Sequence, residues 1–401
     1  MKHLYEKDKV SREELAQAVA ALSDQYDHFL FDVVMRTGKS MLFTELCKKW
    51  KGKILILSAA ESTNKQWKEN LERYNPQLVD RVDIYCYHSL HKLDRKAYDI
   101  IGLDEYELSR SEKRSTQIFE FTPKHWVAMS GTLSFEDRQE FRLLTSNKFY
   151  HVKVDLTQAV KWGILPQPKV YAVKLEFDNT KRYLLYHKGR DKKKRNDIVS
   201  FENRWESIKD SSVNTLIQCT EQEYNELLET DYQYAKSLYE MKSTEAFRLR
   251  WLKKGNERKQ FYGSIKPKHF RKLFSQLPEN ARCLIFCVDI KQADLLNEEF
   301  SVHSQKAGSL DLVEEFNNKN ISKLFTIRML DRGVDFVDVD YVIIIQQSGK
   351  QNSPMQQMGR SLLSVAPKII TFYYPGTQDE KYVQNFLSNF EPEWVVYKTL
   401  K

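Results

Sequence analysis

The sequence predicts an α/β protein in which two parallel-sheet lobes are separated by a largely helical, basic insert. Short apolar segments alternate with helical patterns from about residue 28 to 155, and the alternation returns from about residue 276 to 395. Between these regions the chain is charged, aromatic and helical in pattern. Strand–helix alternation indicates a parallel sheet with helices on both faces. The expected parts are an N-terminal lobe (1–155), a connector with the insert (156–275) and a C-terminal lobe (276–401).

Composition limits the class of protein. At 401 residues the chain is long enough for two or three domains, and 41% of its residues are hydrophobic. No segment approaches the roughly 18 consecutive apolar residues of a membrane span. The charged start, MKHLYEKDKVSREELAQ, lacks the apolar run of a secretory signal. We therefore expect a cytoplasmic protein with no membrane partner.

Cysteine usage and net charge add two further limits. The five cysteines are scattered, and their odd number argues against a disulfide framework. Cys283 and Cys287 lie in the apolar run ARCLIFCVDI, where burial in a core explains them better than a metal site. The formal net charge of +8 suits a polyanion such as nucleic acid, although many soluble proteins share it.

Five apolar segments are the strand candidates of the N-terminal lobe. They are HFLFDVVM, KILILSAA, VDIYCYHS, DIIGLDE and HWVAMSG. Helical patterns such as KSMLFTELCKKWK and STNKQWKENLERYN lie between them. After residue 155, Pro166 and Pro168 interrupt a turn-rich connector that leads into a further strand. In the C-terminal region the strand candidates are ARCLIFCVDI, SKLFTIRML, YVIIIQQS and KIITFYYPG.

The segment FDVVMRTGKSML contains a candidate phosphate-binding turn between a strand and a helix. Such a site needs backbone N–H groups around a concavity, a lysine for the β- and γ-phosphates and a hydroxyl for Mg²⁺. Gly38 allows the tight turn, Lys39 supplies the cation and Ser40 supplies the hydroxyl. The usual pattern has an earlier glycine where this chain has Val33. The TGKS tetrapeptide therefore indicates a site because of its place in the lobe, not by itself.

Two adjacent carboxylates, Asp104 and Glu105, end the apolar segment DIIGLDE. In an ATPase the first holds Mg²⁺, usually through water, and the second polarises the attacking water. For a single Asp-Glu pair, a solvated acidic turn is the more common explanation. Here the pair ends a later strand of the sheet that carries Lys39, and ligand sites in such sheets lie at the carboxyl ends of strands. This order favours the catalytic interpretation.

Later segments carry polar residues at similar positions. WVAMSGTLS ends in Ser130 and Thr132, whose hydroxyls could relay between a nucleotide site and a substrate surface. The last lobe contains TIRMLDRGVDF and QQMGRSLL. An arginine that projects across a lobe interface, such as Arg360, can neutralise the charge on a transferring γ-phosphate. An isolated arginine is more often a surface residue.

Taken in order, these segments resemble the motif series of superfamily 2 helicases, the DEAD/DEAH-like group, of phage or bacterial type. MRTGKS resembles motif I, LSAAESTNKQW motif Ia, YCYHSLHK the motif after it, LDEYE motif II, and MSGT motif III. CLIFCVDIKQADLL resembles motif IV, TIRMLDRGVDF motif V and QQMGRSLL motif VI. The match spans roughly residues 28–365, and the series is more specific than any one member. Arg36 stands at a usual glycine, and Glu107 stands where a histidine is common.

The resemblance implies two RecA-like lobes and an ATP-dependent motor, a DNA helicase or translocase acting on single-stranded, forked or branched DNA. The implied cofactors are ATP and Mg²⁺. The implied nucleotide contacts are Arg36, Thr37, Gly38, Lys39, Ser40, Gly333, Asp335 and Gln356, with Ser40 and Asp104 at the metal. The implied catalytic residues are Lys39, Asp104, Glu105 and Arg360. The implied nucleic-acid contacts are Ser58, His88, Ser130 and Thr132.

Motif VI departs from the family pattern. The family usually carries a second arginine three residues after the first, and this chain has Leu363 there. If the second arginine is the finger, its loss lowers hydrolysis by several orders of magnitude. The open alternatives are that Arg360 acts alone, that Arg328 or Arg332 substitutes, or that the enzyme is weak.

The basic insert is a second candidate surface for nucleic acid. Its run GRDKKKRND includes Lys193 and Arg195, and its segment RLRWLKKGNERKQFYG includes Arg250, Trp251 and Lys254. The cations could follow phosphates while the aromatics stack on bases. Alternatively, the segment is a solvated helical face whose aromatics pack inward onto a lobe. The sequence favours neither.

Two other functions compete with the motor. One is a nucleic-acid-binding protein with a weak or degenerate ATPase site, which Val33, Arg36 and Leu363 suggest. The other is an unrelated α/β nucleotide-binding enzyme such as a small-molecule kinase, which leaves the second lobe and the insert unexplained. Intact groups in motifs I and II favour the motor.

The expected partners follow from the motor hypothesis. They are nucleic acid, with DNA favoured over RNA, and replication or recombination proteins. We expect the chain to be a monomer, and a viral origin would place it in the cytoplasm of the bacterial host.

Overall fold

The computed structural model describes residues 1–180, 182–185, 216–297, 299–302, 308–327, 336, 338–347 and 366–400. Several residues singled out above lie outside this part of the chain, and their roles stay predictions. They are Lys193, Arg195, Arg328, Arg332, Gly333, Asp335, Gln356, Arg360 and Leu363.

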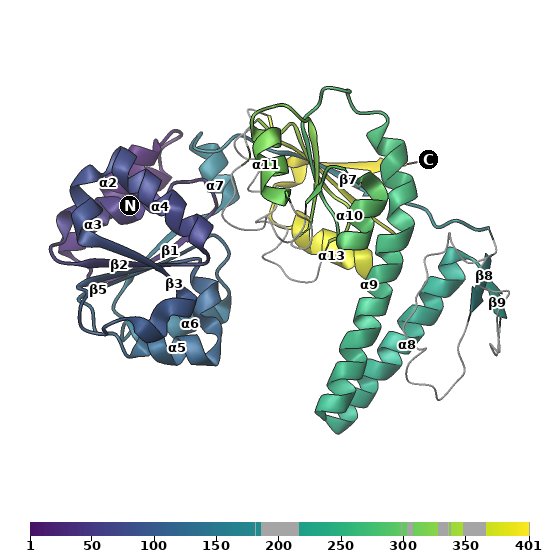
Figure 1. Cartoon of the computed structure of the whole chain (residues 1–401), viewed down its shortest axis with the longest axis horizontal. Coiled ribbons are helices and arrows are strands. Elements are labelled where there is room, and N and C mark those ends of the chain that lie inside the picture. The colour runs from purple at the N-terminus through teal and green to yellow at the C-terminus, as the bar shows by residue number, and fades with distance from the viewer. Residues whose placement is uncertain are drawn as a thin grey trace.

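Two parallel sheets form the cores of two lobes, which lie side by side in Figure 1. Over the described residues the strand order is β3-β2-β4-β5-β1-β6 in the first sheet and β11-β12-β10-β13-β14-β7-β15 in the second. The first sheet consists of β1 (Phe29–Val33), β2 (Ile54–Ser58), β3 (Val82–Cys86), β4 (Ile100–Asp104), β5 (His125–Ser130) and β6 (Tyr150–Val154). The second consists of β7 (Lys169–Lys174), β10 (Cys283–Phe286), β11 (Ser301–Val302), β12 (Lys323–Thr326), β13 (Tyr341–Ile344), β14 (Lys368–Tyr373) and β15 (Val395–Thr399). All the paired neighbours in both sheets are parallel, as predicted.

Helices connect the strands in both lobes. The first lobe contains α1 (Lys2–Tyr5), α2 (Arg12–Ala20), α3 (Lys39–Lys49), α4 (Glu61–Tyr74), α5 (Glu112–Phe119), α6 (Phe135–Leu144) and α7 (Leu156–Lys161). It also contains the short 3₁₀ helices η1 (Ala21–Asp24), η2 (Pro76–Arg81), η3 (Tyr87–Lys92) and η4 (Tyr106–Arg110). The second lobe contains α10 (Ile290–Asn297), α11 (Ser309–Asn317), α13 (Gln378–Leu387) and η7 (Pro392–Trp394). Among the helices that the structure describes, none has the length and apolar character to cross a membrane.

Side chains of the first sheet alternate between two cores. Phe29 and Phe31 of β1 join the cluster that contains Leu42 of α3. Leu30 points to the opposite face and joins the cluster that contains Phe141 of α6. Successive strand residues point to opposite faces, so a strand with apolar residues on both faces needs helices on both sides. The strand–helix alternation in the sequence therefore predicted this layered arrangement correctly.

Strand β7 belongs to the second sheet although it precedes the insert in sequence. It pairs with β14 on one side and with the C-terminal strand β15 on the other. Its residues 169–174 fall within the range assigned above to the connector and insert. Val170 and Ala172 are fully buried in this sheet. The second lobe is therefore built from chain on both sides of the insert.

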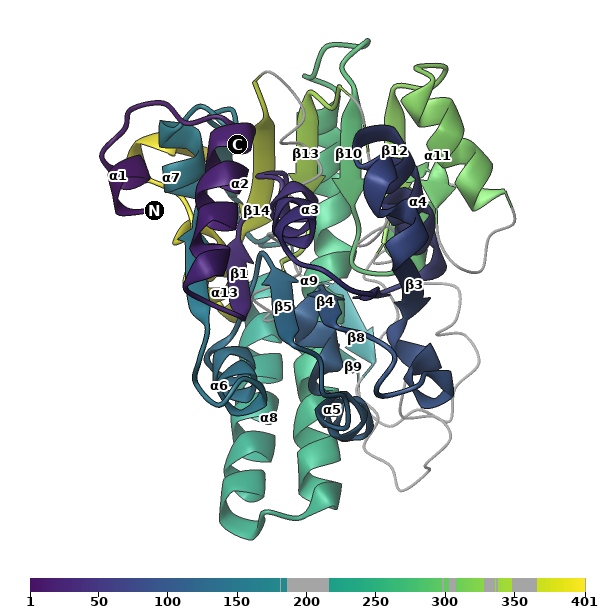
Figure 2. The same ribbon diagram turned by 90° about the vertical axis from the view of Figure 1, so that its left-hand side faces the viewer.

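The described part of the insert is a two-stranded antiparallel pair followed by a long helical hairpin. The pair is β8 (Arg182–Leu185) with β9 (Leu216–Cys219), and the hairpin is α8 (Glu221–Lys242) with α9 (Glu245–Phe274). A capping box formed by Thr220 and Glu223 begins α8. Figures 1 and 2 show the hairpin extending away from the second sheet, with its far end beyond both lobes. The helical pattern predicted for this region agrees with the helices at residues 221–242 and 245–274, whereas the strand pair was not predicted.

Helix α9 is anchored to the second lobe by a proline in its interior. Pro267 has no N–H, so it cannot donate to the carbonyl of Gly263 one turn earlier. The side chain of Gln292 replaces that donor, because its Nε2 donates to the Gly263 carbonyl over 2.6 Å. The Oε1 of Gln292 accepts from the backbone N–H of Val288 over 2.9 Å. A helix that would be weakened at this point is thereby joined to the start of α10.

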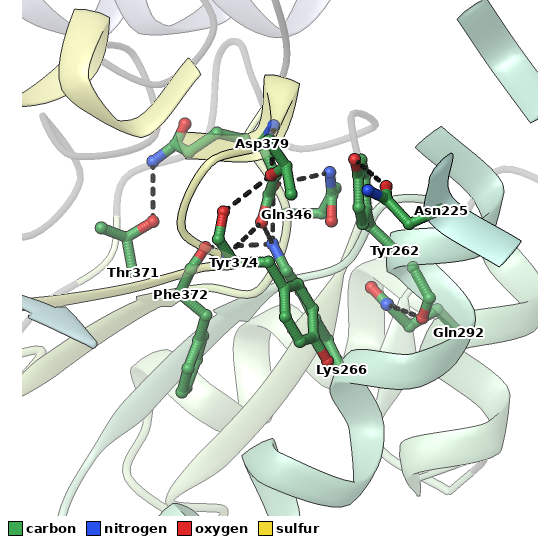
Figure 3. A network of polar contacts seen from close by, with 12 residues as sticks. Asn225, Tyr262, Lys266, Gln292, Gln346, Thr371, Phe372, Tyr374 and Asp379 are labelled. Carbon is green, nitrogen blue, oxygen red and sulfur yellow. Dashed lines mark hydrogen bonds and ion pairs between the residues drawn. The ribbon is translucent and has the colours of Figure 1, made fainter. Parts of the chain in front are cut away.

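A buried ion pair fixes the same part of α9 to α13 (Figure 3). The Nζ of Lys266 lies 2.8 Å from Oδ2 of Asp379, and neither side chain is exposed. Lys266 also donates to the carbonyl of Phe372 over 3.0 Å. Asp379 accepts from Nε2 of Gln346 over 3.1 Å and from the N–H of Tyr374 over 3.2 Å. A buried ion pair whose two partners are also hydrogen-bonded favours this one position of α9 against the sheet.

Candidate active site

The predicted phosphate-binding turn lies between β1 and α3. Gly38 caps α3 with a φ of +107°, a left-handed conformation in which a glycine is least strained. Arg36 also has a positive φ, +68°. The guanidinium group of Arg12 donates to the Arg36 carbonyl over 3.2 and 3.1 Å and to the Ile164 carbonyl over 3.1 Å. The turn is therefore held from outside by the first residue of α2.

Lys39 begins α3 and faces the carboxylates of the LDEYE segment. Its Nζ lies 3.4 Å from Oε1 of Glu105, and 13% of its side chain is exposed. Burial opposes the charge of this lysine, but the facing carboxylates outweigh burial and raise the pKa of its ammonium group. Lys39 therefore stays charged at the N-terminus of a helix, where backbone N–H groups also favour an anion.

Asp104 is the last residue of β4, and donors hold both of its carboxylate oxygens. The N–H of Glu105 donates to Oδ1 over 3.1 Å, and the indole Nε1 of Trp67 donates to Oδ2 over 2.9 Å. The hydroxyl of Tyr87 donates to the backbone carbonyl of Asp104 over 3.0 Å. Burial raises the pKa of the Asp104 carboxyl, and the charge of Lys39 opposes that shift. The side chain is thus fixed in direction at the carboxyl edge of the sheet.

Glu107 connects the LDEYE segment to the end of β5. Burial and then the charge of Glu105 raise the pKa of Glu107 to about 8. Side-chain hydrogen bonds join Glu107 to Glu105 and to Ser130. The Oγ of Ser130 in turn accepts from the N–H of Thr132 over 3.1 Å. A carboxyl that keeps its proton at neutral pH can donate, so it can bridge a carboxylate and a hydroxyl.

The MSGT segment lies against the start of the phosphate-binding turn. A Cβ at Gly131 would lie 3.2 Å from both the carbonyl of Val33 and the N–H of Met35, which explains the need for glycine there. The hydroxyls of Thr37 and Thr132 are buried and have no hydrogen-bond partner among the described residues. Unsatisfied hydroxyls are rare in native interiors, and that of Thr37 belongs to the turn itself.

This set of groups fits a nucleotide and a magnesium ion. Thr37 offers an unused hydroxyl, Lys39 a cation and Asp104 an oriented carboxylate. Hydroxyl and carboxylate oxygens suit Mg²⁺, and a lysine at a helix N-terminus suits phosphates. The predicted residues of motifs I and II are therefore brought together in space.

The residues predicted to contact nucleic acid are placed less uniformly. Ser58 and Ser130 are fully buried. The Ser58 hydroxyl faces two acceptors, the carbonyl of Ala60 at 3.2 Å and Oδ1 of Asn64, and it has one proton to donate to them. His88, at the start of η3, is exposed. A direct contact through Ser58, His88, Ser130 or Thr132 stays a prediction.

The predicted contacts on the helical hairpin are engaged within the hairpin. Trp251 stacks on Tyr239, with ring centroids 5.5 Å apart. Lys254 lies 2.7 Å from Asp231 and 2.8 Å from Glu257. These contacts stay within the hairpin, so Trp251 does not pack onto a lobe as the alternative expected, and nucleic-acid contacts through Trp251 and Lys254 stay predictions. Arg250 is exposed, with its guanidinium group 5.6 Å from the centre of the Tyr234 ring.

The two lobes meet at a cavity beside this site. The hydroxyl of Thr157, in α7, donates to Oε1 of Glu391 over 2.7 Å. The adjacent cavity has a volume of about 400 Å³. Its lining includes Asp32, Val34 and Gly131 of the first lobe and residues 388–391 of the second. The phosphate-binding turn therefore begins at the junction of the lobes.

Sequence reasoning missed two side chains that shape the site. Trp67 was noted as the last residue of the segment that resembles motif Ia and as part of a helical pattern, without a role of its own, and Arg12 only as part of a charged N-terminus. Both act on residues far away in sequence, so no local pattern signals them. The role of Glu107 was also missed, although its place in LDEYE was noted.

Comparisons with known proteins agree with this geometry. Residues 265–362 match the model of the helicase conserved C-terminal domain. The S. cerevisiae Dbp5 structure bound to RNA and ADP BeF3 has a TM-score of 0.59 and 11% identity, and the match covers 98% of this chain and 90% of that one. The Pyrococcus furiosus Hef helicase domain has a TM-score of 0.50 and 13% identity, with 92% and 97% covered. No curated protein sequence matches the chain.

These identities show a shared fold, and the predicted RecA-like lobes are thereby confirmed. The family match adds a helicase domain that covers most of the second lobe. The family model thus identifies a helicase C-terminal domain in residues 265–362, and the structural similarity shows the fold of the whole chain.

Proposed function

We propose that this chain is an ATP-dependent nucleic-acid motor, a helicase or translocase that hydrolyses ATP between its two lobes. One observation carries the proposal. Lys39, at the N-terminus of α3, lies 3.4 Å from Glu105, next to the buried carboxylate of Asp104. A cation and two carboxylates converge at the carboxyl edge of a parallel sheet, which is where phosphoryl transfer needs them.

The first lobe would hold the phosphates and the metal. Backbone N–H groups from Gly38 onward and the Lys39 ammonium group would bind phosphate oxygens, and the Thr37 hydroxyl would gain a partner. Ser40 and Asp104 would hold Mg²⁺, which when bound neutralises charge on the phosphates. Glu105 would orient and polarise the attacking water. Its ion pair with Lys39 would then open, because phosphates replace the carboxylate as the partner of the lysine.

The second lobe would complete the site. Arg360 is proposed as the arginine that stabilises the transferring phosphoryl group. Gly333, Asp335 and Gln356 are proposed as further nucleotide contacts. Closure and reopening of the lobes would alternate the spacing of two strand-gripping surfaces and so move the motor along one strand.

The kind of nucleic acid on which the motor acts is a separate part of the proposal. The sequence favoured DNA in single-stranded, forked or branched form, whereas one protein of similar fold is bound to RNA. The basic insert is proposed as an additional contact for either polymer, through Lys193, Arg195 and Arg250. A phage or bacterial type, a cytoplasmic location, a monomeric state and replication or recombination partners are further proposals that follow from the motif resemblance.

Steady-state ATP hydrolysis with and without nucleic acid tests the proposed function. Single-stranded DNA, forked DNA and single-stranded RNA would be compared at equal nucleotide concentration. Lys39→Ala is the control, because it removes the phosphate-binding cation. The proposal expects hydrolysis that at least one polymer stimulates and that Lys39→Ala abolishes. Hydrolysis that persists in the control would assign it to another site or to a contaminant.

A second candidate is a nucleic-acid-binding protein with a weak or degenerate ATPase site. Its motivation is Val33 at the position of a usual glycine and Leu363 at the position of a usual arginine. It predicts nucleic-acid binding without stimulated hydrolysis in the same assay. Intact Lys39 and Glu105 favour the motor over this alternative.

A further inference from the structure

Trp67 makes a direct contact with a carboxylate of the candidate site. Its indole Nε1 donates to Oδ2 of Asp104 over 2.9 Å, and 3% of the residue is exposed. The ring packs edge-on against Phe43 of α3, with centroids 5.9 Å apart. A buried N–H with a charged acceptor is stronger than a neutral hydrogen bond. Trp67 therefore holds the oxygen that no backbone group holds.

The orientation of Asp104 depends on this donor. The backbone N–H of Glu105 fixes only Oδ1. If the indole N–H of Trp67 were absent, Oδ2 of Asp104 would lose this donor. The carboxylate could then rotate about the bond from Cβ to the carboxyl carbon. A carboxylate that binds a metal needs both a set direction and a retained charge, and neighbouring donors supply both.

Trp67 also connects the site to a different surface element. It lies in α4, whose first turns are tied to the ends of two strands of the sheet. The hydroxyl of Ser58, at the end of β2, bonds to Oδ1 of Asn64, and Nδ2 of Asn64 lies 3.3 Å from Sγ of Cys86 at the end of β3. Asn64 and Trp67 are three residues apart, so they lie on neighbouring positions of one helical face. A shift of the loop after β2 would therefore move the indole.

We propose that Trp67 is a positioning residue whose indole N–H orients the Asp104 carboxylate and couples that orientation to the position of α4. This inference rests on the proposed function, because it assigns Asp104 to the metal. It makes the affinity for a magnesium nucleotide, and not the affinity for the nucleotide alone, depend on the indole.

The variant Trp67→Phe tests the inference, because it removes the donor and keeps an aromatic ring against Phe43. Binding of ADP to the full chain would be measured by calorimetry in excess Mg²⁺ and again in EDTA. Loss of a partner that orients a metal ligand typically weakens metal affinity or activity by about 10- to 100-fold. We expect ADP affinity in Mg²⁺ to fall by roughly 10-fold at least, and ADP affinity in EDTA to stay within about twofold of the wild-type value.

Trp162→Phe is the matched control. Trp162 is fully buried in the same lobe, and its Nε1 donates to the Leu4 carbonyl over 3.1 Å, away from the site. Both variants lose one buried indole donor, so both should lose stability. Only Trp67→Phe should lose the difference between ADP affinity with Mg²⁺ and ADP affinity with EDTA. If Trp67→Phe does not fold, Trp67→Met, which fills the space without a donor, replaces it.

The outcomes separate the inference from the proposed function. A wild-type protein that binds ADP equally with Mg²⁺ and with EDTA overturns the inference, and the ATP-hydrolysis assay decides the proposed function separately. A wild-type protein whose ADP affinity depends on Mg²⁺, with an equal dependence in Trp67→Phe, overturns the inference and leaves the proposed function intact. Equal effects in Trp67→Phe and Trp162→Phe reduce the role of Trp67 to packing, and so overturn the inference.

Discussion

The buried pair of Lys266 and Asp379 gives the largest expected effect on stability. The variant Lys266→Met keeps the apolar length of the side chain and removes its charge. Both partners are fully buried, so the change leaves a carboxylate without its counter-ion. Breaking a buried pair from one side typically costs about 3–5 kcal/mol. Asp379 keeps donors from Gln346 and Tyr374, so we expect a loss near the lower end, about 3 kcal/mol.

Lys268→Met is the matched control for this prediction. Lys268 lies on the same helix and pairs with Glu221 over 2.6 Å, but 30% of its side chain is exposed. Glu221 is itself buried, but it keeps the N–H of Asp178 as a donor over 2.8 Å and water reaches Lys268, so the control should lose clearly less stability than Lys266→Met. The measurement is the urea-unfolding transition of the second lobe in both variants, and circular dichroism monitors the unfolding.

The pH dependence provides a second readout of the same variant. Burial already raises the pKa of Asp379, while Lys266 opposes that shift. Without Lys266 the carboxyl binds a proton more readily in the folded state than in the unfolded state. Stability that depends on such a proton is present at low pH and is lost as pH rises. The loss of unfolding free energy in Lys266→Met should therefore be smaller at pH 5 than at neutral pH. A loss no larger than that of Lys268→Met, or a loss that does not change with pH, would refute the reasoning.

Three further predictions concern the candidate site and the insert. Burial raises the pKa of Glu107 from 4.5 to about 8, so the wild type should lose stability relative to Glu107→Gln as pH rises through that window. The measurement is urea unfolding of both proteins at pH 5 and at pH 8. A difference in unfolding free energy between the two proteins that is the same at both pH values would contradict this. Gly131→Ala places a Cβ 3.2 Å from backbone atoms of the phosphate-binding turn. The variant should therefore lower the free energy of unfolding by about 1–3 kcal/mol and raise the KM for ATP. An unchanged KM and an unchanged urea midpoint would argue against close packing at Gly131. Reversing the charges of Lys193 and Arg195 should reduce the slope of log affinity for nucleic acid against log salt by about 2, and an unchanged slope would remove them from the interface.

The fold could be predicted from sequence where local patterns determine it. Strand–helix alternation indicated a parallel sheet covered on both faces, and β1 (Phe29–Val33), which is apolar except at Asp32, is one of its strands. The turn around Gly38 was recognisable because glycine, lysine and serine stand between a strand and a helix. The start of α8 follows a capping box, which also depends on neighbours in sequence.

Other features depend on contacts between distant segments and could not be predicted. β7 looks like part of a connector, and only its pairing with β14 and β15 places it in the second sheet. Trp67 looks in the sequence like an apolar residue of a helix, yet its indole N–H donates to Asp104, 37 residues later. The basic segment of α9 suggested a nucleic-acid surface, but Lys254 is paired with Asp231 of the adjacent helix.

The central claim is that Lys39, Asp104 and Glu105 form a site that hydrolyses ATP in response to nucleic acid. Glu105→Gln tests it most directly, because the change keeps the size of the side chain and removes the group that polarises water. The measurement is nucleic-acid-stimulated ATP hydrolysis, with ADP binding in Mg²⁺ as the control for an intact site. We predict that hydrolysis falls by at least about 100-fold while ADP still binds. Hydrolysis within a few-fold of the wild-type rate would contradict the account.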